Sequence, residues 1–79
     1  MINSVINIDP EIMSGVPVFK GTRVTIQTLF DYLEHGRNLE DFLEGFPSVT
    51  KEQATSLLEL AKSILTSKEK LALIDENSH

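Results

Sequence analysis

The stretch TIQTLFDYLEHGRNLEDFLEGFPSVTKEQATSLLELAKSIL, residues 25–65, contains three runs in which apolar residues recur at intervals of three and four. This spacing places the apolar side chains on one face of an α-helix, so the stretch predicts three amphipathic helices. The apolar positions are Ile26, Leu29, Phe30 and Leu33 in the first run, Leu39, Phe42, Leu43 and Phe46 in the second, and Ala54, Leu57, Leu58, Ala61, Ile64 and Leu65 in the third.

Residues that typically begin and end helices stand at the borders of these runs. Thr25 and Asn38 are suitable N-caps for the first and second helices. Thr50 with Gln53 forms a capping-box pair at the start of the third helix, and Gly36 is placed to end the first. Periodicity and capping residues therefore agree on the same three helices.

Short connections between the three predicted helices favour a tri-helical helix-turn-helix core. Any small three-helix bundle would show the same spacing, so the pattern alone leaves both architectures open.

The residues before the helices, 5–24, contain repeated proline and glycine and predict short extended segments joined by turns. Gly21 is expected at positive φ in a tight turn. The strand candidates are Val5–Ile8, Val16–Phe19 and Thr22–Val24. The predicted fold class is therefore mainly α, with a small N-terminal β-hairpin or ribbon before the helical core.

The 79 residues, 41% of them hydrophobic and 24% charged, suit a single domain with one core. Within 1–79 we expect a ribbon at 5–24, a helical core at 25–65 and a C-terminal segment at 66–79. In this last segment Thr66 with Glu69 could cap a new short helix, whereas Leu71 and Ala72 also stay in phase with the third helix. Both interpretations remain open.

The bulk composition limits the environment and the partners. The absence of cysteine favours a reducing compartment, and no apolar run approaches the roughly 20 residues needed to cross a bilayer, so a cytoplasmic protein without a membrane partner is expected. The net charge of -5 disfavours strong non-specific binding to nucleic acid. The charge is spread evenly between the halves of the chain, with three basic and five acidic residues in 1–40 and four and seven in 41–79.

Candidate catalytic and metal-binding groups are sparse. His35 and His79 are the only histidines and lack partners at metal-ligand spacing. Glu40, Asp41 and Glu44 sit near the start of the second helix, where negative charge suits the helix dipole. We therefore expect no enzyme activity, no catalytic or metal site and no cofactor.

Two apolar residues, Tyr32 and Leu60, lie outside the apolar faces of their predicted helices. If they lay together, or beside Ile12 and Met13, they would form a patch suited to a dimer or partner interface.

The run Ile8–Ile12, followed by the Gly-x-Pro-x-x-x-Gly-Thr-Arg pattern of 15–23, resembles the opening of a bacterial family, the domain-of-unknown-function family 433. The resemblance continues through the helices to Leu65. It implies a homeodomain-like tri-helical fold. It also implies a role like that of antitoxins of VapB type, which bind and silence a PIN-like ribonuclease toxin, commonly dimerise and repress their own operon.

Our leading functional hypothesis is thus an antitoxin-like protein that binds a PIN-like ribonuclease toxin and forms a homodimer. The residues expected to bind this partner are Lys20, Arg23, Leu71, Leu73, Ile74, Asp75 and Glu76. Lys20 and Arg23 could hold a carboxylate or phosphate of a partner, although we favour an internal ion pair of Arg23 with Asp9 or Glu11.

The alternative is a helix-turn-helix transcriptional regulator without a toxin partner, which reads operator DNA with the start of the third helix. The residues expected to reach phosphates or bases are Lys51, Gln53, Thr55, Ser56 and Lys62. Glu52 and Glu59 on the same helix would repel phosphate, so binding by the isolated chain is expected to be weak.

Overall fold

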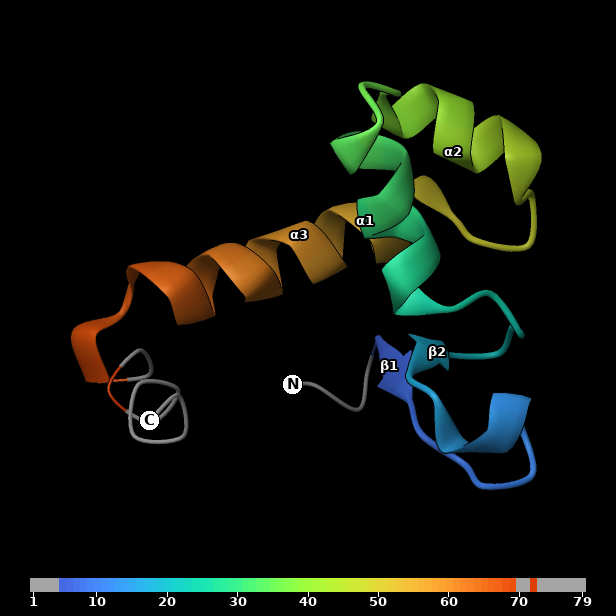
Figure 1. Ribbon diagram of the computed structural model, residues 1–79, viewed down its shortest axis with the longest axis horizontal. Coiled ribbons are helices and arrows are strands. Elements are labelled where there is room, and N and C mark those ends of the chain that lie inside the picture. The colour runs from blue at the N-terminus through green and yellow to red at the C-terminus, as the bar shows by residue number, and fades with distance from the viewer. Residues whose placement is uncertain (1–4, 70–71, 73–79) are drawn as a thin grey trace.

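The computed structural model describes residues 5–69 and 72 and shows three helices after a small two-stranded sheet (Figure 1). The predicted mainly helical fold with an N-terminal ribbon is confirmed. The elements, in chain order, are β1 (Ile6–Asn7), the 3-10 turn η2 (Met13–Gly15), β2 (Val18–Phe19), α1 (Ile26–Glu34), α2 (Leu39–Gly45) and α3 (Lys51–Thr66).

The sheet is antiparallel, with Ile6 opposite Phe19 and Asn7 opposite Val18. Both strands are shorter than the sequence predicts. Gly21 has φ +81° in the turn after β2, as expected, and the turn is closed by the bond of 3.0 Å from the Thr22 amide to the Phe19 carbonyl.

The prediction of a third strand at Thr22–Val24 is wrong. The Thr22 hydroxyl donates to the Phe19 carbonyl at 2.8 Å and accepts from the Val24 amide at 3.0 Å. These local side-chain bonds hold the backbone in a turn instead of leaving it extended for a sheet.

The 3-10 turn η2 lies between the first two strand candidates, where the sequence predicts a turn but not its helical form. Two non-glycine residues, Met13 and Ser14, adopt φ of 52° and 58°. The amides of Gly15 and Val16 bond back to the carbonyls of Ile12 and Met13, both at 3.1 Å. These bonds offset part of the cost of the left-handed conformation.

The predicted helix caps are confirmed. The Thr25 and Asn38 side chains accept the amides of Thr28 and Asp41, and the Thr50–Gln53 capping box is formed. After α1, Gly36 has φ +78° and donates to Leu33, and the next amide bonds to the Tyr32 carbonyl at 3.0 Å. This pattern is a Schellman motif, which satisfies the last carbonyls of the helix.

The core lies where the sheet, α1, α2 and the first half of α3 meet. The fully buried side chains are contributed by all of these elements. The buried residues are Val5, Val18, Phe19, Leu29, Phe42, Val49, Ala54 and Leu57. The rings of Phe19 and Phe42, with centroids 5.9 Å apart, join the sheet to α2.

Tyr32 packs against this core. Its position outside the apolar stripe of α1 had suggested that it could belong to an exposed patch, and this prediction is wrong. Its ring makes edge contacts with Phe42 and Phe46, at centroid distances of 5.7 and 5.8 Å. Its hydroxyl lies over Gly45, where an added Cβ would be 3.0 Å away. The missing side chain of Gly45 therefore lets α1 and α2 approach closely.

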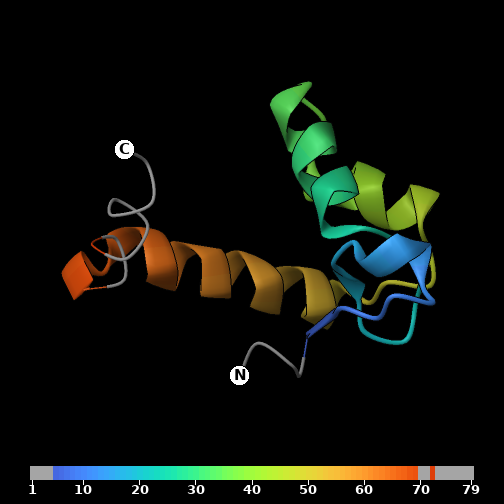
Figure 2. The same ribbon diagram turned by 60° about the horizontal axis from the view of Figure 1, so that its bottom comes forward.

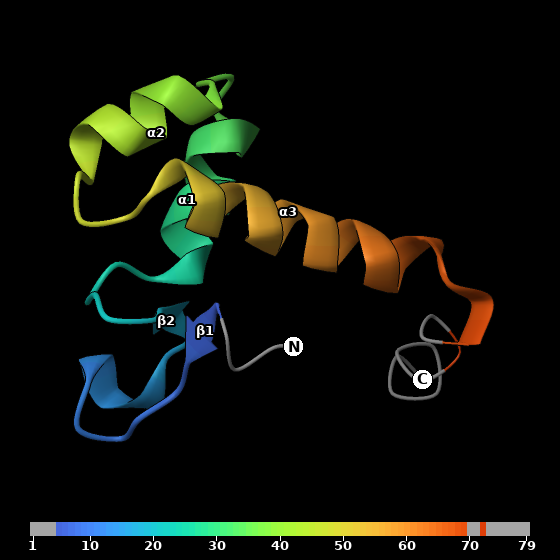
Figure 3. The same cartoon turned by 180° about the vertical axis from the view of Figure 1, so that it is seen from behind.

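The second half of α3 extends away from the sheet and from the other two helices (Figure 2). Figure 3 shows the same projection from behind. The helix ends at Thr66, where Ser67 is extended with φ -97° and ψ 125°, and the backbone is helical again at 68–69 and at Ala72. The possibility that Ala72 continues the third helix in phase is therefore wrong. Within the described residues, no helix is long and apolar enough to cross a membrane.

Candidate functional site

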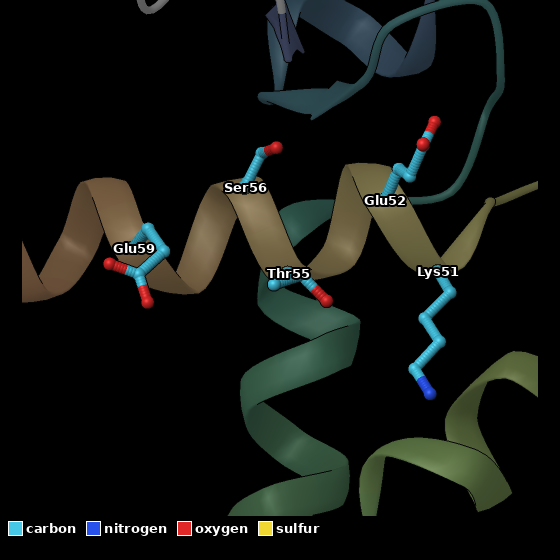
Figure 4. Close-up of a pocket in the computed structure, with 5 residues that line it drawn as sticks. All are labelled: Lys51, Glu52, Thr55, Ser56 and Glu59. Atoms are coloured by element: carbon cyan, nitrogen blue, oxygen red, sulfur yellow. The ribbon is translucent and has the colours of Figure 1, made fainter.

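The outer face of α3 carries three of the residues predicted to bind DNA. Lys51, Thr55 and Ser56 line an open hollow of about 680 Å³ together with Glu52 and Glu59 (Figure 4). Thr55 and Ser56 are exposed, so their hydroxyls are free to meet a ligand. Lys62 is also exposed but lies outside this hollow.

The charge on this outer face does not favour phosphate. The Lys51 ammonium lies 3.6 Å from the Glu40 carboxylate of α2, so its charge is partly balanced within the molecule. Glu52 and Glu59 place two carboxylates around the hydroxyls of Thr55 and Ser56. The face therefore suits a neutral or cationic ligand better than a nucleic-acid backbone.

Gln53, the fourth predicted DNA-binding residue, uses its side chain inside the protein. Its carbonyl oxygen accepts the Thr50 amide at 3.1 Å, and its NH₂ group donates to the Lys20 carbonyl at 2.9 Å. Because a base contact would need the same two polar atoms, Gln53 is committed to holding α3 against the turn after β2.

The turn residues Lys20 and Arg23 are consequently beside the start of α3, a proximity that the sequence did not reveal. Both side chains are exposed. The internal ion pair expected for Arg23 is absent, because neither the Asp9 nor the Glu11 carboxylate pairs with its guanidinium. Asp9 instead accepts a hydrogen bond of 2.9 Å from the Glu11 amide. Arg23 therefore presents its guanidinium to solvent.

One family model matches most of these elements. It is DUF433, "Protein of unknown function (DUF433)", and it covers residues 6–61. The chain belongs to the DUF433 family. The matched region runs from the first residue of β1 to Ala61 in α3, so it includes the sheet, α1, α2 and the buried part of α3. No curated protein and no solved structure matches the chain.

Within the DUF433 region, the segment 31–44, which runs from α1 through the connecting turn into α2, is rich in negative charge, and we call it the acidic corner. Residues 31–44 contain five carboxylates and one arginine. The even charge of the two halves of the chain does not reveal this cluster, because the boundary between residues 40 and 41 falls inside it. The only ion pair within the acidic corner joins Arg37 to Asp41 at 3.3 Å. The carboxylates are Asp31, Glu34, Glu40, Asp41 and Glu44, and all but Asp41 are exposed.

His35 lies in the acidic corner and has a local structural role. Its Nδ1 lies 2.7 Å from the Asp31 carbonyl, at the C-terminal end of α1. The guanidinium carbon of Arg37 lies 5.3 Å from the centre of the Tyr32 ring, a cation–π contact. Among residues 5–69 and 72 there is no group of three or more His, Cys, Asp or Glu side chains that could hold a metal ion.

The ribbon of the DUF433 region exposes three large apolar side chains, of which only Met13 was named from the sequence as part of a possible partner patch. Ile8, Met13 and Val16 are 62%, 42% and 40% exposed. An alternation of apolar and polar residues along a strand can show which side chains face outward, but strands of two residues are too short to show it. The predicted partner-binding residues Leu71, Leu73, Ile74, Asp75 and Glu76 lie outside the described residues.

Proposed function

We propose that this DUF433 chain is an antitoxin-like binding protein whose partner is a PIN-like ribonuclease toxin. The acidic corner of α1 and α2 carries the proposal, because an RNA-cleaving enzyme binds its substrate through a basic surface. Five carboxylates within 14 residues offer a complementary potential to such a surface. Occupation of that surface would keep RNA out without any catalysis by this chain.

DNA binding is the second candidate, and the exposed Thr55 and Ser56 near the start of α3 favour it. The turn with Lys20 and Arg23 lies beside the same helix end and could add phosphate contacts. The carboxylates of Glu52 and Glu59 oppose this function. We therefore place operator binding second, as an activity that a complex with a more basic partner would strengthen.

Charge reversal tests the proposed docking surface. Glu34→Lys with Glu44→Lys changes the charge at two exposed positions near the C-terminal ends of α1 and α2, where positive charge suits the helix dipoles and folding should persist. We expect this variant to bind a co-expressed PIN-like ribonuclease at least about tenfold more weakly, with RNA cleavage restored. The matched control, Glu52→Lys with Glu59→Lys, makes the same change of charge on α3 and should still neutralise the enzyme.

The outcomes separate the two candidate functions. If the acidic-corner variant neutralises like the original protein, docking occurs elsewhere, and removal of the residues after Ser67 then tests the C-terminal segment. If the α3 control gains tight, sequence-specific binding in a mobility-shift titration, or the original protein already has it, the regulator becomes the better proposal. Failure of the original protein to co-purify with any ribonuclease encoded beside it would reject the antitoxin role.

A further inference from the structure

The strand β1 has a neighbouring strand on one side only. β2 pairs with β1 through Ile6–Phe19 and Asn7–Val18, and on its other side Val18 is bridged to Thr25. Figure 1 shows β2 between β1 and the loop that leads to α1. Within the described residues, β1 is therefore the open edge of the sheet.

The hydrogen-bond pattern shows which backbone groups of β1 face outward. The Lys20 amide donates to the Val5 carbonyl at 2.8 Å, a bond that flanks the pair formed by Ile6 with its partner in β2. In an antiparallel sheet such a pair is not hydrogen-bonded, so the N–H and the C=O of Ile6 both point away from β2. Because Asn7 turns its C=O toward β2 and the next peptide bond is trans, the N–H of Ile8 also points away.

These outward groups have no partner in the part of the chain that the structure describes. No hydrogen bond there involves the N–H or C=O of Ile6 or the N–H of Ile8. Their two-residue spacing matches the main chain of an extended strand. A helix cannot pair with them, because its own N–H and C=O groups are bonded internally. The edge therefore specifies an extended conformation for its occupant.

The edge also lacks the features that discourage strand pairing. Edge strands are commonly protected by a charged side chain or a proline. Residues 5–8 read Val-Ile-Asn-Ile and contain neither. The side chain of Ile8 is 62% exposed, so an apolar residue of an added strand would cover it.

The carboxylates that follow β1 favour a positively charged occupant. Asp9 and Glu11 stand just after the edge, and neither forms an ion pair with a described residue. Residues 5–12 contain no lysine or arginine. A basic side chain placed opposite Asp9 would therefore meet uncompensated negative charge.

We propose that β1 binds an extended, positively charged segment of another protein, which adds a third, antiparallel strand to the sheet. Apolar side chains of this segment lie opposite Ile6 and Ile8, and a lysine or arginine lies opposite Asp9. The site is separate from the acidic corner, so the proposal does not depend on the antitoxin role. Three main-chain hydrogen bonds form a weak site, so a short peptide should bind with a dissociation constant of about 1 mM.

Titration of the full chain with the synthetic peptide acetyl-KVTVT-amide, followed by NMR of the protein amides, tests the proposal. In the expected register its two valines lie opposite Ile6 and Ile8, and its lysine lies opposite Asp9. At about 10 mM peptide roughly nine-tenths of the protein is bound, so the amides of Ile6 and Ile8 should exchange with solvent about tenfold more slowly. The Asn7 amide, which faces β2, should change little.

Modified peptides separate main-chain pairing from the attraction of side chains. A methyl group on the fourth amide nitrogen removes the donor to the Ile6 carbonyl and should weaken binding at least about tenfold. The matched control carries the methyl group on the third nitrogen, which points away from β1, and should bind like the original peptide. Glutamate in place of the lysine should weaken binding at least about threefold.

Ile8→Pro tests the same edge from the side of the protein. It removes the outward N–H and leaves the bonds between β1 and β2 in place, so peptide binding should weaken at least about fivefold while the other amide signals persist. Ile8→Val is the control, because it keeps both the N–H and a β-branched side chain, and should bind like the original protein.

Unchanged exchange of the Ile6 and Ile8 amides at about 10 mM peptide would overturn the proposal. Slow exchange of these amides without peptide would overturn it as well. If that protection rises with protein concentration, a second copy pairs with the edge, and if it does not, another part of the same chain covers it. Equal weakening by the two N-methylated peptides would reject strand pairing, and equal binding of the glutamate peptide would reject a positively charged occupant.

Discussion

The side-chain NH₂ group of Gln53 donates a hydrogen bond of 2.9 Å to the backbone carbonyl of Lys20, 33 positions earlier in the chain. The same side chain accepts the Thr50 amide, so one residue both caps α3 and holds it against the turn after β2. The start of α3 and the ribbon therefore form one unit.

Gln53→Ala should lower the free energy of unfolding by about 1 to 2 kcal/mol, because it removes a capping interaction and a hydrogen bond between elements. Gln53→Glu keeps the acceptor for the Thr50 amide but cannot donate to Lys20, so it should cost roughly half as much. Urea unfolding of both variants measures the difference. Equal stability of Gln53→Ala and the original protein would show that the bond to Lys20 does not support the fold.

The contact between Tyr32 and Gly45 gives a second prediction. Alanine in place of a helical glycine normally stabilises by up to about 1 kcal/mol. Here the new Cβ would lie 3.0 Å from the Tyr32 hydroxyl, and the ring is held by Phe42 and Phe46. We expect Gly45→Ala to destabilise by about 1 kcal/mol instead.

Tyr32→Phe provides the control for this substitution, because it removes the hydroxyl and keeps the ring. In the Tyr32→Phe protein, Gly45→Ala should become neutral or stabilising. Thermal unfolding of all four proteins gives the coupling energy, which we expect to be about 1 kcal/mol. Additive effects would contradict the close contact.

Substitution of Gly21 should lower the free energy of unfolding through the backbone conformation alone. Its φ is +81°, and an added Cβ would have no neighbour within 4 Å. Gly21→Ala should therefore lower the free energy of unfolding by about 1 kcal/mol, and Gly21→Val should lower it more. Gly21→Asn should lower it least, because asparagine tolerates this conformation. Melting temperatures that fall equally for all three variants would indicate a steric cause.

Burial along α3 distinguishes two adjacent leucines. Leu57 is only 3% exposed, whereas Leu58 is half-buried and packs against the edge of the core. Leu57→Ala should cost about 2 to 5 kcal/mol by leaving a cavity, and Leu58→Ala should cost clearly less. Denaturant titration of the two variants compares them directly, and a larger loss for Leu58→Ala would mean that the helix is rotated from the arrangement described.

The three helices and their ends could be predicted from local sequence alone. Thr25, Asn38 and Thr50 bond to amides three residues later, and the glycine after α1 satisfies carbonyls of the preceding turn. These interactions join residues near each other in the chain, so local sequence is enough to predict them. The positive φ of Gly21 was predictable for the same reason.

Which side chains remain available for function could be seen only from the packing of the elements against one another. The position of Tyr32 on α1 suggested an exposed side chain, but its ring packs against Phe42 and Phe46. Gln53 was predicted to contact DNA, but its side chain is hydrogen-bonded to the Lys20 carbonyl. Helical periodicity reports one face of one element, whereas burial and hydrogen bonding between elements depend on how distant segments meet.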